Sequence, residues 1–246
     1  MGLREDIQKK VKDIIDNDVA ITEIEYIPKL DDPKLTFGNT GLKFKGTVLY
    51  IDMRGSTKIL NNHQKKTVAK LHMAFFHAIV KIANSLNGNV RSFNGDSALI
   101  FFQGDTKGVI KDAVKCGMQI KFMLSQDQGG IVQQLKKYSE IDFGIGIDHG
   151  EIICTKVGAG GEHNRDLFWI GNAVNKSASL GDSSEGPHHL SISKFVYDNL
   201  LDEVKFGQKL NIFQEKIKTD MWSRDTFDYN DSSEYYYSSS WFWKVY

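Results

Sequence analysis

The stretch from Thr47 to Thr57, which reads T-V-L-Y-I-D-M-R-G-S-T, most restricts how this chain can fold. Its β-branched and large apolar residues predict a buried strand that leads into a glycine turn and a helix. Asp52 ends the apolar run, and a buried carboxylate there needs a cation because an uncompensated charge is costly. Gly55 permits a tight turn, and Ser56 or Thr57 can cap the next helix. This arrangement suits a metal and a phosphate, although a strand end with a capping aspartate explains the same residues.

The composition argues against several classes of protein. The chain has 246 residues with 31 basic and 31 acidic side chains, so its net charge does not indicate a nucleic-acid or anionic-membrane partner. Cys116 and Cys154 lack the spacing of a zinc site or a disulfide framework. The apolar runs are much shorter than the ~20 residues of a membrane helix. The charged start, Arg4-Glu5-Asp6, does not read as a signal peptide. We therefore expect a soluble, cytoplasmic protein with no nucleic-acid and no membrane partner.

The hydropathy pattern divides the chain into three parts. Residues 1–43 read as an N-terminal helix, Leu3 to Ile15, with an extension, and we expect this helix to pack on the domain or on a partner subunit. Residues 44–204 read as the central domain. Residues 205–246 form an aromatic-rich C-terminal extension. We expect a terminal strand or hairpin there that packs on the core or on a second subunit, with a base-stacking platform as the alternative.

The central part has the pattern of an α+β fold. We expect helices from Thr57 to Leu86 and from Thr106 to about Leu124, separated by a hairpin over residues 90–102. A second hairpin is expected to turn at Asp148-His149-Gly150, with His149 as a surface or packing residue. A glycine-rich loop, Gly158 to Arg165, lacks the phosphate-binding signature. The order of elements predicts a mostly antiparallel sheet with helices on one face.

A second carboxylate, Asp96, directly follows the Asn94-Gly95 turn signal of the first hairpin. If this hairpin pairs beside the first strand, Asp52 and Asp96 face each other near the middle of the sheet. A simple turn residue is the alternative interpretation of Asp96.

Four sequence blocks resemble the class III nucleotidyl cyclases. In the order of that family they are Y-I-D-M-R-G-S-T, N-G-N-V-R-S-F-N-G-D, G-I-G-I-D-H-G-E and W-I-G-N-A-V-N. The resemblance implies a ferredoxin-like catalytic core over residues 44–204 and a head-to-tail homodimer with two active sites at its interface. It also implies two divalent metal ions per site, Mn²⁺ or Mg²⁺, a nucleoside triphosphate substrate and release of pyrophosphate.

The same resemblance assigns roles to individual residues. Asp52 and Asp96 match the metal ligands, to which Met53 would add its backbone carbonyl. The backbone N–H groups of Arg54 to Thr57 would bind the phosphates. Asn175 matches the asparagine that orients the ribose, and it would come from the other subunit.

Three positions depart from the family's pattern. Ser92 and Phe168 replace the pair that reads the purine edge, so neither purine has its usual hydrogen-bond partners. Tyr50 and Phe168 are bulky enough to fill the space that a smaller pyrimidine leaves. Ser179 replaces the arginine that stabilises the transition state. Arg54 lies next to the phosphate turn and can fork onto phosphate oxygens, so it is our candidate for the substitute cation.

The Y-x-D-M-R-G-S-T block is most similar to that of the bacterial pyrimidine cyclases of the Pycsar anti-phage system. This similarity implies conversion of UTP to 3′,5′-cyclic UMP, or of CTP to cyclic CMP, as a second messenger read by a separate effector protein. We expect UTP, with CTP as the alternative, followed by an adenylate or guanylate cyclase and by a degenerate domain that binds nucleotide without turnover. A diguanylate-type enzyme is disfavoured because the G-G-[DE]-E-F turn is absent.

Overall fold

The structure, a computed structural model, describes residues 2–127, 130–158 and 164–246. The strands are β1 (Ala20–Glu23), β2 (Thr40–Arg54), β3 (Asn89–Asn94), β4 (Ser97–Gln103), β5 (Asp142–Gly158), β6 (Arg165–Ile170), β7 (Leu190–Ser193), β8 (Phe206–Leu210), β9 (Lys216–Asp220), β10 (Ser223–Tyr229) and β11 (Ser232–Ser239). The helices are α1 (Leu3–Asp16), α2 (Ser56–Asn62), α3 (Lys65–Ser85), α4 (Lys107–Lys121), α5 (Ile131–Lys136), α6 (Asn172–Ser183), α7 (Lys194–Asp198) and α8 (Asp202–Lys205), with a π-helical turn at Phe122–Gln126.

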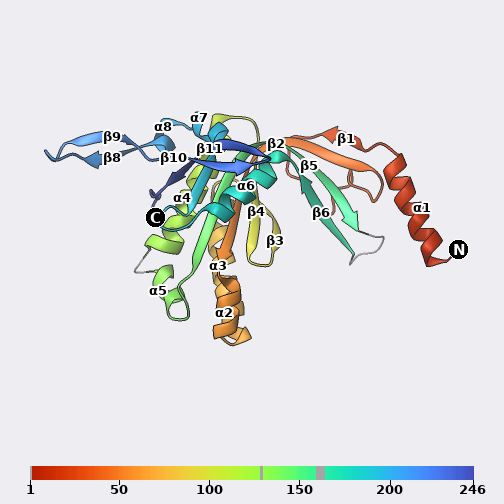
Figure 1. The fold of residues 1–246 in the computed structure, drawn as a ribbon, viewed down its shortest axis with the longest axis horizontal. Helices are drawn as coiled ribbons and strands as arrows, with labels where there is room; N and C mark the ends of the chain where they lie inside the picture. The colour runs from red at the N-terminus through yellow and green to blue at the C-terminus, as the bar shows by residue number, and fades with distance from the viewer. Residues whose placement is uncertain (1, 128–129, 159–163) are drawn as a thin grey trace.

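One twisted sheet organises the molecule (Figure 1). Its strands follow the order β10-β11-β7-β5-β2-β4-β3, with β1 beside β2 and β6 beside β5, while β8 and β9 form a separate hairpin. The pairs β1–β2 and β5–β7 are parallel, and the other pairs among the described strands are antiparallel. The predicted α+β class with a mostly antiparallel sheet is therefore confirmed. The long strands β2 and β5 pair with each other from Gly41 to Arg54 and form the axis of the sheet.

Helices cover both faces of this sheet, so the expectation of helices on one face is wrong. Leu49, Ile51 and Met53 of β2 belong to the buried cluster that α3 and α4 cover. Tyr50, which points to the other face because side chains alternate along a strand, lies against Gly181 of α6. The sheet is therefore sandwiched where β2 ends.

The predicted second hairpin is also wrong, because β5 continues through Asp148, His149 and Gly150 without a turn. The Nδ1 atom of His149 forms a hydrogen bond with Thr47 Oγ1, at 2.9 Å, and its Nε2 atom forms one with the carboxylate of Asp105, at 3.0 Å. Its side chain is only 3% exposed, as expected for a packing histidine. Polar partners across the strands thus satisfy residues that locally favour a turn.

The hairpin β3–β4 forms as predicted, with Asn94 paired to Ser97 beside the turn. The predicted helix from Thr57 to Leu86 is divided into α2 and α3, because His63 and Gln64 adopt extended backbone conformations. The glycine-rich loop predicted from Gly158 to Arg165 lies largely outside the described residues.

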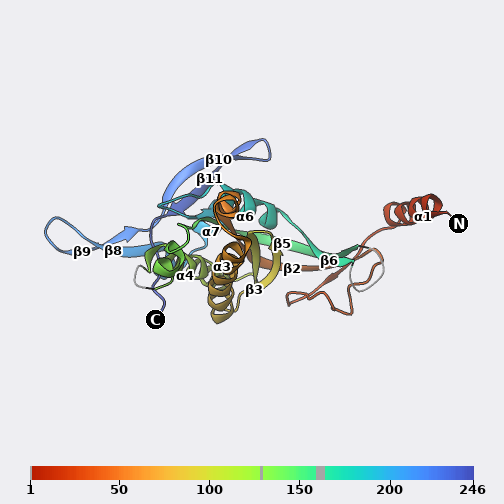
Figure 2. The same ribbon diagram turned by 90° about the horizontal axis from the view of Figure 1, so that it is seen from below.

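The two ends of the chain extend the sheet in different ways. α1 forms as predicted but has no buried residue, and Figure 2 shows it projecting from the body. Its contacts with its own domain include a hydrogen bond from Asn39 Nδ2 to the carbonyl oxygen of Ile14, at 2.8 Å. In the C-terminal extension, the predicted hairpin is β10–β11, and β11 pairs with β7 so that Tyr237 reaches the core. The boundaries at 43/44 and 204/205 stay predictions, and β2 begins before the first of them. No helix among the described residues is long and apolar enough to cross a membrane.

Candidate active site

Two acidic residues meet where β2 leaves the sheet. Asp52 pairs across the strands with Ser97, and the N–H of Met53 donates to the carbonyl oxygen of Asp96 at 3.1 Å. Burial, and then the charge and hydrogen bonding of Asp96, raise the pKa of Asp52 to about 6. The carboxylates of Asp52 and Asp96 are therefore close enough to interact, as the sequence led us to expect.

These residues fit a divalent cation. Burial and the neighbouring charge of Asp96 disfavour the negative charge of Asp52, and a bound cation would offset both effects. Across the described ranges, no group of three or more histidine, cysteine, aspartate or glutamate side chains is placed to hold a metal. The remaining ligands would have to be main-chain or substrate oxygens. Met53 suits the first kind, because its side chain is in the core and only its backbone belongs to the site.

The turn after β2 differs in one detail from the prediction. Gly55, not Ser56 or Thr57, occupies the N-cap of α2, and its φ of 69° is in the left-handed region that favours glycine. Ser56 is the first residue of the helix, and no side chain in the described part of the chain caps it. Ser56 is half-buried and Thr57 is exposed, which leaves the outer side of the turn accessible to a ligand.

Two of the residues predicted to face the base lie in one row across the sheet. Ser92 pairs with Leu99, Leu99 pairs with Tyr50, and Tyr50 pairs with Gly146. Cross-strand partners share a face, so Ser92 and Tyr50 are on the α6 side of the sheet. Tyr50 is half-buried, and this burial raises the pKa of its hydroxyl to about 12, so the group is a neutral hydrogen-bonding phenol near pH 7.

Phe168 and Asn175 do not join Asp52 within one chain. Asp52 pairs with Gly144 of β5, whereas Phe168 pairs with Thr155, eleven residues further along the same strand. At ~3.3 Å per residue this corresponds to about 36 Å. Phe168 is 56% exposed. Asn175 is also exposed, on the side of α6 that faces away from the sheet. A second copy of the chain would have to bring these residues to Asp52.

Arg54 is already engaged. Its Nη2 donates to the carbonyl oxygens of Gly181, at 3.0 Å, and of Asp182, at 2.5 Å, in the last turn of α6. Its Nε is buried and has no hydrogen-bond partner among the residues that the structure describes. Ser179, where the family has an arginine, is half-buried on the same helix.

Sequence reasoning missed Asp182 and Gly181. The charge of Asp182 contributes to the raised pKa values of both Asp52 and Tyr50. Gly181 lets α6 approach the Tyr50 ring, since an added Cβ would lie 2.5 Å from its Cδ1 atom. The available signal was the glycine inside a helical pattern, which often marks a close approach.

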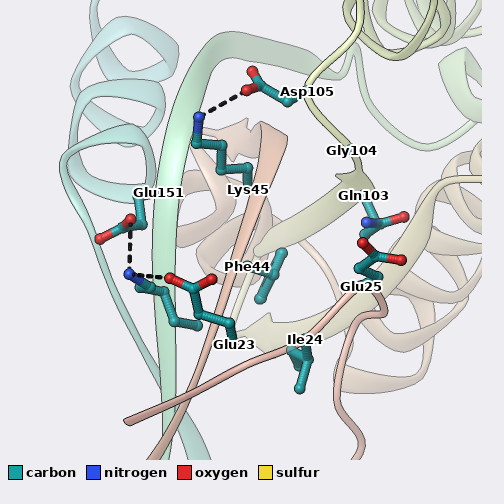
Figure 3. A pocket seen from close by; sticks show the side chains of 10 residues that line it. Glu23, Ile24, Glu25, Phe44, Lys45, Gln103, Gly104, Asp105 and Glu151 are labelled. Atoms are coloured by element: carbon teal, nitrogen blue, oxygen red, sulfur yellow. Dashed lines mark hydrogen bonds and ion pairs between the residues drawn. The ribbon is translucent and has the colours of Figure 1, made fainter.

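A charged hollow elsewhere is not part of this site. Figure 3 shows its lining residues, and its volume is about 280 Å³. Lys43 pairs with Glu23 at 2.7 Å and with Glu151 at 3.4 Å, and Lys45 pairs with Asp105 at 2.7 Å. None of the predicted site residues lines it.

The chain belongs to the family of adenylate and guanylate cyclase catalytic domains, whose sequence model matches residues 44–222. The resemblance to class III cyclases is thereby confirmed, and the protein is a nucleotidyl cyclase.

The sequence identities to individual relatives are low. The chain is 28% identical over 252 residues to a uridylate cyclase from Xanthomonas perforans and 26% identical over 246 residues to one from Burkholderia cepacia, with 100% of each chain covered in both cases. Among solved structures, the guanylyl cyclase Cya2 superposes with a TM-score of 0.65 at 18% identity, covering 83% of this chain and 95% of that one. The adenylyl cyclase CyaB from P. aeruginosa superposes with a TM-score of 0.64 at 19% identity, covering 81% and 95%. The structures support the fold alone.

Proposed function

We propose that this protein is a uridylate cyclase, which converts UTP to 3′,5′-cyclic UMP and pyrophosphate. One observation carries the proposal. Asp52 is close enough to Asp96 for the charge of Asp96 to raise its pKa, and it lies two residues along β2 from Tyr50, on the same face of the sheet. The names of the two full-length relatives support uracil as the base.

The reaction is an intramolecular displacement at phosphorus. The 3′-oxygen forms a bond to the α-phosphorus as the bond from that phosphorus to the pyrophosphate oxygen breaks, and the hydroxyl proton passes to solvent water. Asp52, Asp96 and the Met53 carbonyl would hold the two divalent cations, Mn²⁺ or Mg²⁺. When bound, such cations lower the pKa of the hydroxyl and neutralise the leaving group.

The remaining residues bind and orient the substrate. The backbone of residues 54–57 would contact the phosphates beside Gly55. The outer side of Gly55 is open, because no atom of the described residues beyond its chain neighbours lies within 4 Å of a Cβ added there. Tyr50 would bound the base pocket and offer its neutral hydroxyl to the uracil edge. Ser92 lies in the same row and is too short to read a purine as a lysine does.

The site is proposed to be shared in a head-to-tail homodimer. In one chain, Phe168 pairs with Thr155, far along β5 from Gly144, the partner of Asp52. An antiparallel second copy would place its own Phe168 and Asn175 opposite this Asp52. Arg54 as the substitute for the arginine missing at Ser179 stays a prediction, which the mixing experiment below tests.

The product is proposed to act in the cytoplasm as a second messenger of anti-phage defence, read by a separate effector protein. CTP is the second candidate substrate, because Tyr50 limits the size of the base but no residue described above distinguishes the two pyrimidine edges.

The experiment is to measure kcat/KM for UTP, CTP, ATP and GTP separately with Mn²⁺. We expect UTP to exceed both purine triphosphates by at least a hundredfold, and Asp52→Asn to lose activity while remaining folded. A preference for ATP or GTP contradicts the proposal. Full activity of Asp52→Asn contradicts the metal site.

A further inference from the structure

We infer that Arg54 is a positioning residue for α6, and that through α6 it acts on the active site of the partner subunit. The inference rests on the proposed function, in which the outward face of α6 completes the site formed by the partner's Asp52 and Asp96. A transition-state cation would act in the site that contains Asp52 of its own subunit, whereas the inference has Arg54 act on the site that contains the partner's Asp52.

The contact of Arg54 is with the end of α6. The carbonyls of the last helical turn lack the N–H partners of the helix interior, and a cation is favourable there. That of Gly181 also accepts a hydrogen bond from the N–H of the C-cap residue Ser184, at 3.1 Å. Arg54 donates to two of these carbonyls, those of Gly181 and Asp182, at 3.0 and 2.5 Å. Its buried Nε shows that the side chain enters the seam between β2 and α6 instead of following the exposed turn.

Side chains hold the first half of α6, among them Val174 in a buried cluster, but the half that ends near Arg54 meets β5 at two glycines. A Cβ added at Gly144 would lie 2.1 Å from the carbonyl oxygen of Gly181, and one added at Gly146 would lie 2.0 Å from that of Ser177. At these two points the helix rests on bare strand backbone, where close approach replaces interdigitated side chains. Arg54 reaches this interface from the strand that carries Asp52, and hydrogen bonds fix direction as well as distance.

A fixed helix end matters because α6 presents its functional residues outward. Asn175, Ser179 and Asp182 are spaced four and three apart and so share one side of the helix. Asn175 is exposed there. From Asn175 to Gly181 the helix rises ~9 Å, so a shift or rotation of the last turn is transmitted directly to Asn175.

A mixed dimer separates the two roles of Arg54. One subunit carries Asp52→Asn and keeps Asn175, and the other carries Asn175→Ala and keeps Asp52. Co-expression with two affinity tags and tandem purification yields a dimer with one intact shared site, formed by Asp52 of the second subunit and Asn175 of the first. Arg54→Ala is then added to either subunit.

We expect Arg54→Ala in the subunit that donates Asn175 to lower kcat of the mixed dimer at least tenfold, and in the subunit that donates Asp52 to lower it less than threefold. Lys58→Ala in the Asn175-donating subunit is the control, because it removes an exposed cation of α2 that has no assigned role. An equal or larger effect in the Asp52-donating subunit overturns the inference and supports a transition-state cation. A mixed dimer without activity, although both tags are present, overturns the shared site and with it the inference, whereas turnover of UTP by the wild-type protein tests the proposed function separately.

Hydrogen exchange of the wild-type and Arg54→Ala homodimers tests the positioning role without turnover. We expect the amides of residues 176–183 to exchange at least fivefold faster in the variant, with β2 and α4 unchanged. Arg54→Lys, which keeps a donor at the helix end, is expected to restore part of the protection. Unchanged exchange in α6 overturns the positioning role, whatever the state of the shared site.

Discussion

The ring of Tyr50 packs directly on Gly181, so closely that a Cβ at residue 181 would lie 2.5 Å from Cδ1 of the ring. Through this contact Tyr50, which is proposed to limit the size of the base, touches α6. The same helix is proposed to complete the active site of the partner subunit. Because the ring has backbone on one side, its position in the pocket depends on where α6 lies.

Gly181→Ala is expected to destabilise the protein by about 1–3 kcal/mol, because the new methyl group overpacks the contact with Tyr50. In a helix the same substitution otherwise stabilises by roughly 0.5–1 kcal/mol. Urea denaturation measures the change. Gly108→Ala is the matched control, since the nearest atom to its Cβ lies 3.6 Å away. If both variants have unchanged or raised stability, the close contact is wrong.

Tyr50→Ala is expected to raise the ratio of purine to UTP turnover at least tenfold, because removal of the ring enlarges the pocket by the volume that separates the two base classes. Tyr50→Phe keeps this volume and is expected to weaken UTP binding without admitting purines. Product analysis in single-substrate assays measures both ratios. Tyr138→Ala, on an exposed tyrosine, controls for loss of aromatic surface. An unchanged purine ratio in Tyr50→Ala would show that another residue limits the base.

The carboxylate of Asp52 makes stability depend on pH. Its pKa is about 6 in the folded protein, against about 4 in an unfolded chain. Between these values the folded state binds more protons, so this group lowers stability as pH rises from about 4 to about 6, and the loss persists above. Asp52→Asn removes the effect. In EDTA, the stability of the variant relative to wild type is therefore expected to be higher at pH 7.5 than at pH 4.5.

Thermal unfolding at the two pH values provides the measurement, with Asp18→Asn as an exposed control. Mn²⁺ is expected to stabilise the wild type and to have little effect on Asp52→Asn, because the cation removes the repulsion that burial of two carboxylates creates. Equal stabilisation of both proteins by Mn²⁺ would contradict the assignment of Asp52 as a ligand.

Lys121 is a second group that makes stability depend on pH, and it has no proposed role in the reaction. Its Nζ donates to the carbonyl oxygens of His188, at 2.6 Å, and Ser239, at 2.7 Å, and so joins α4 to the C-terminal extension. Burial lowers its pKa to about 7. The unfolded chain binds more protons between this pH and about 10.4, so the contribution of Lys121 to stability rises with pH over that interval.

Lys121→Met is expected to gain less stability than the wild type between pH 7 and pH 9 in urea denaturation. Lys107→Met, at the exposed start of the same helix, should behave as the wild type. An identical pH dependence in Lys121→Met and the wild type would show that Lys121 is not the group responsible.

The parts of the fold that local pattern specifies were predictable from the sequence. The hairpin β3–β4, the helices α1, α4 and α6, and the strand that carries Asp52 all follow from periodicity and turn residues. The turn expected at Asp148-His149-Gly150 failed because its polar groups find partners across the sheet, among them Thr47 and Asp105 for His149. Such partners come from distant parts of the chain, which a local pattern does not contain.

The candidate site divides in the same way. The proximity of Asp52 and Asp96 followed from one strand and one hairpin. The engagement of Arg54 with Gly181 and Asp182 did not, because it depends on the face on which α6 packs. That face is set by Gly144 and Gly146, where the absence of a side chain leaves room for α6 to pack against β5. In a sequence, glycines like these indicate turns or flexibility instead.

The most direct test of the central claim is a competition assay, in which the purified protein receives equimolar UTP, CTP, ATP and GTP with Mn²⁺ and the products are identified by mass spectrometry. We predict 3′,5′-cyclic UMP as the principal cyclic nucleotide, formed with one pyrophosphate per molecule and absent with Asp52→Asn. Cyclic AMP or cyclic GMP as the principal product would contradict the account.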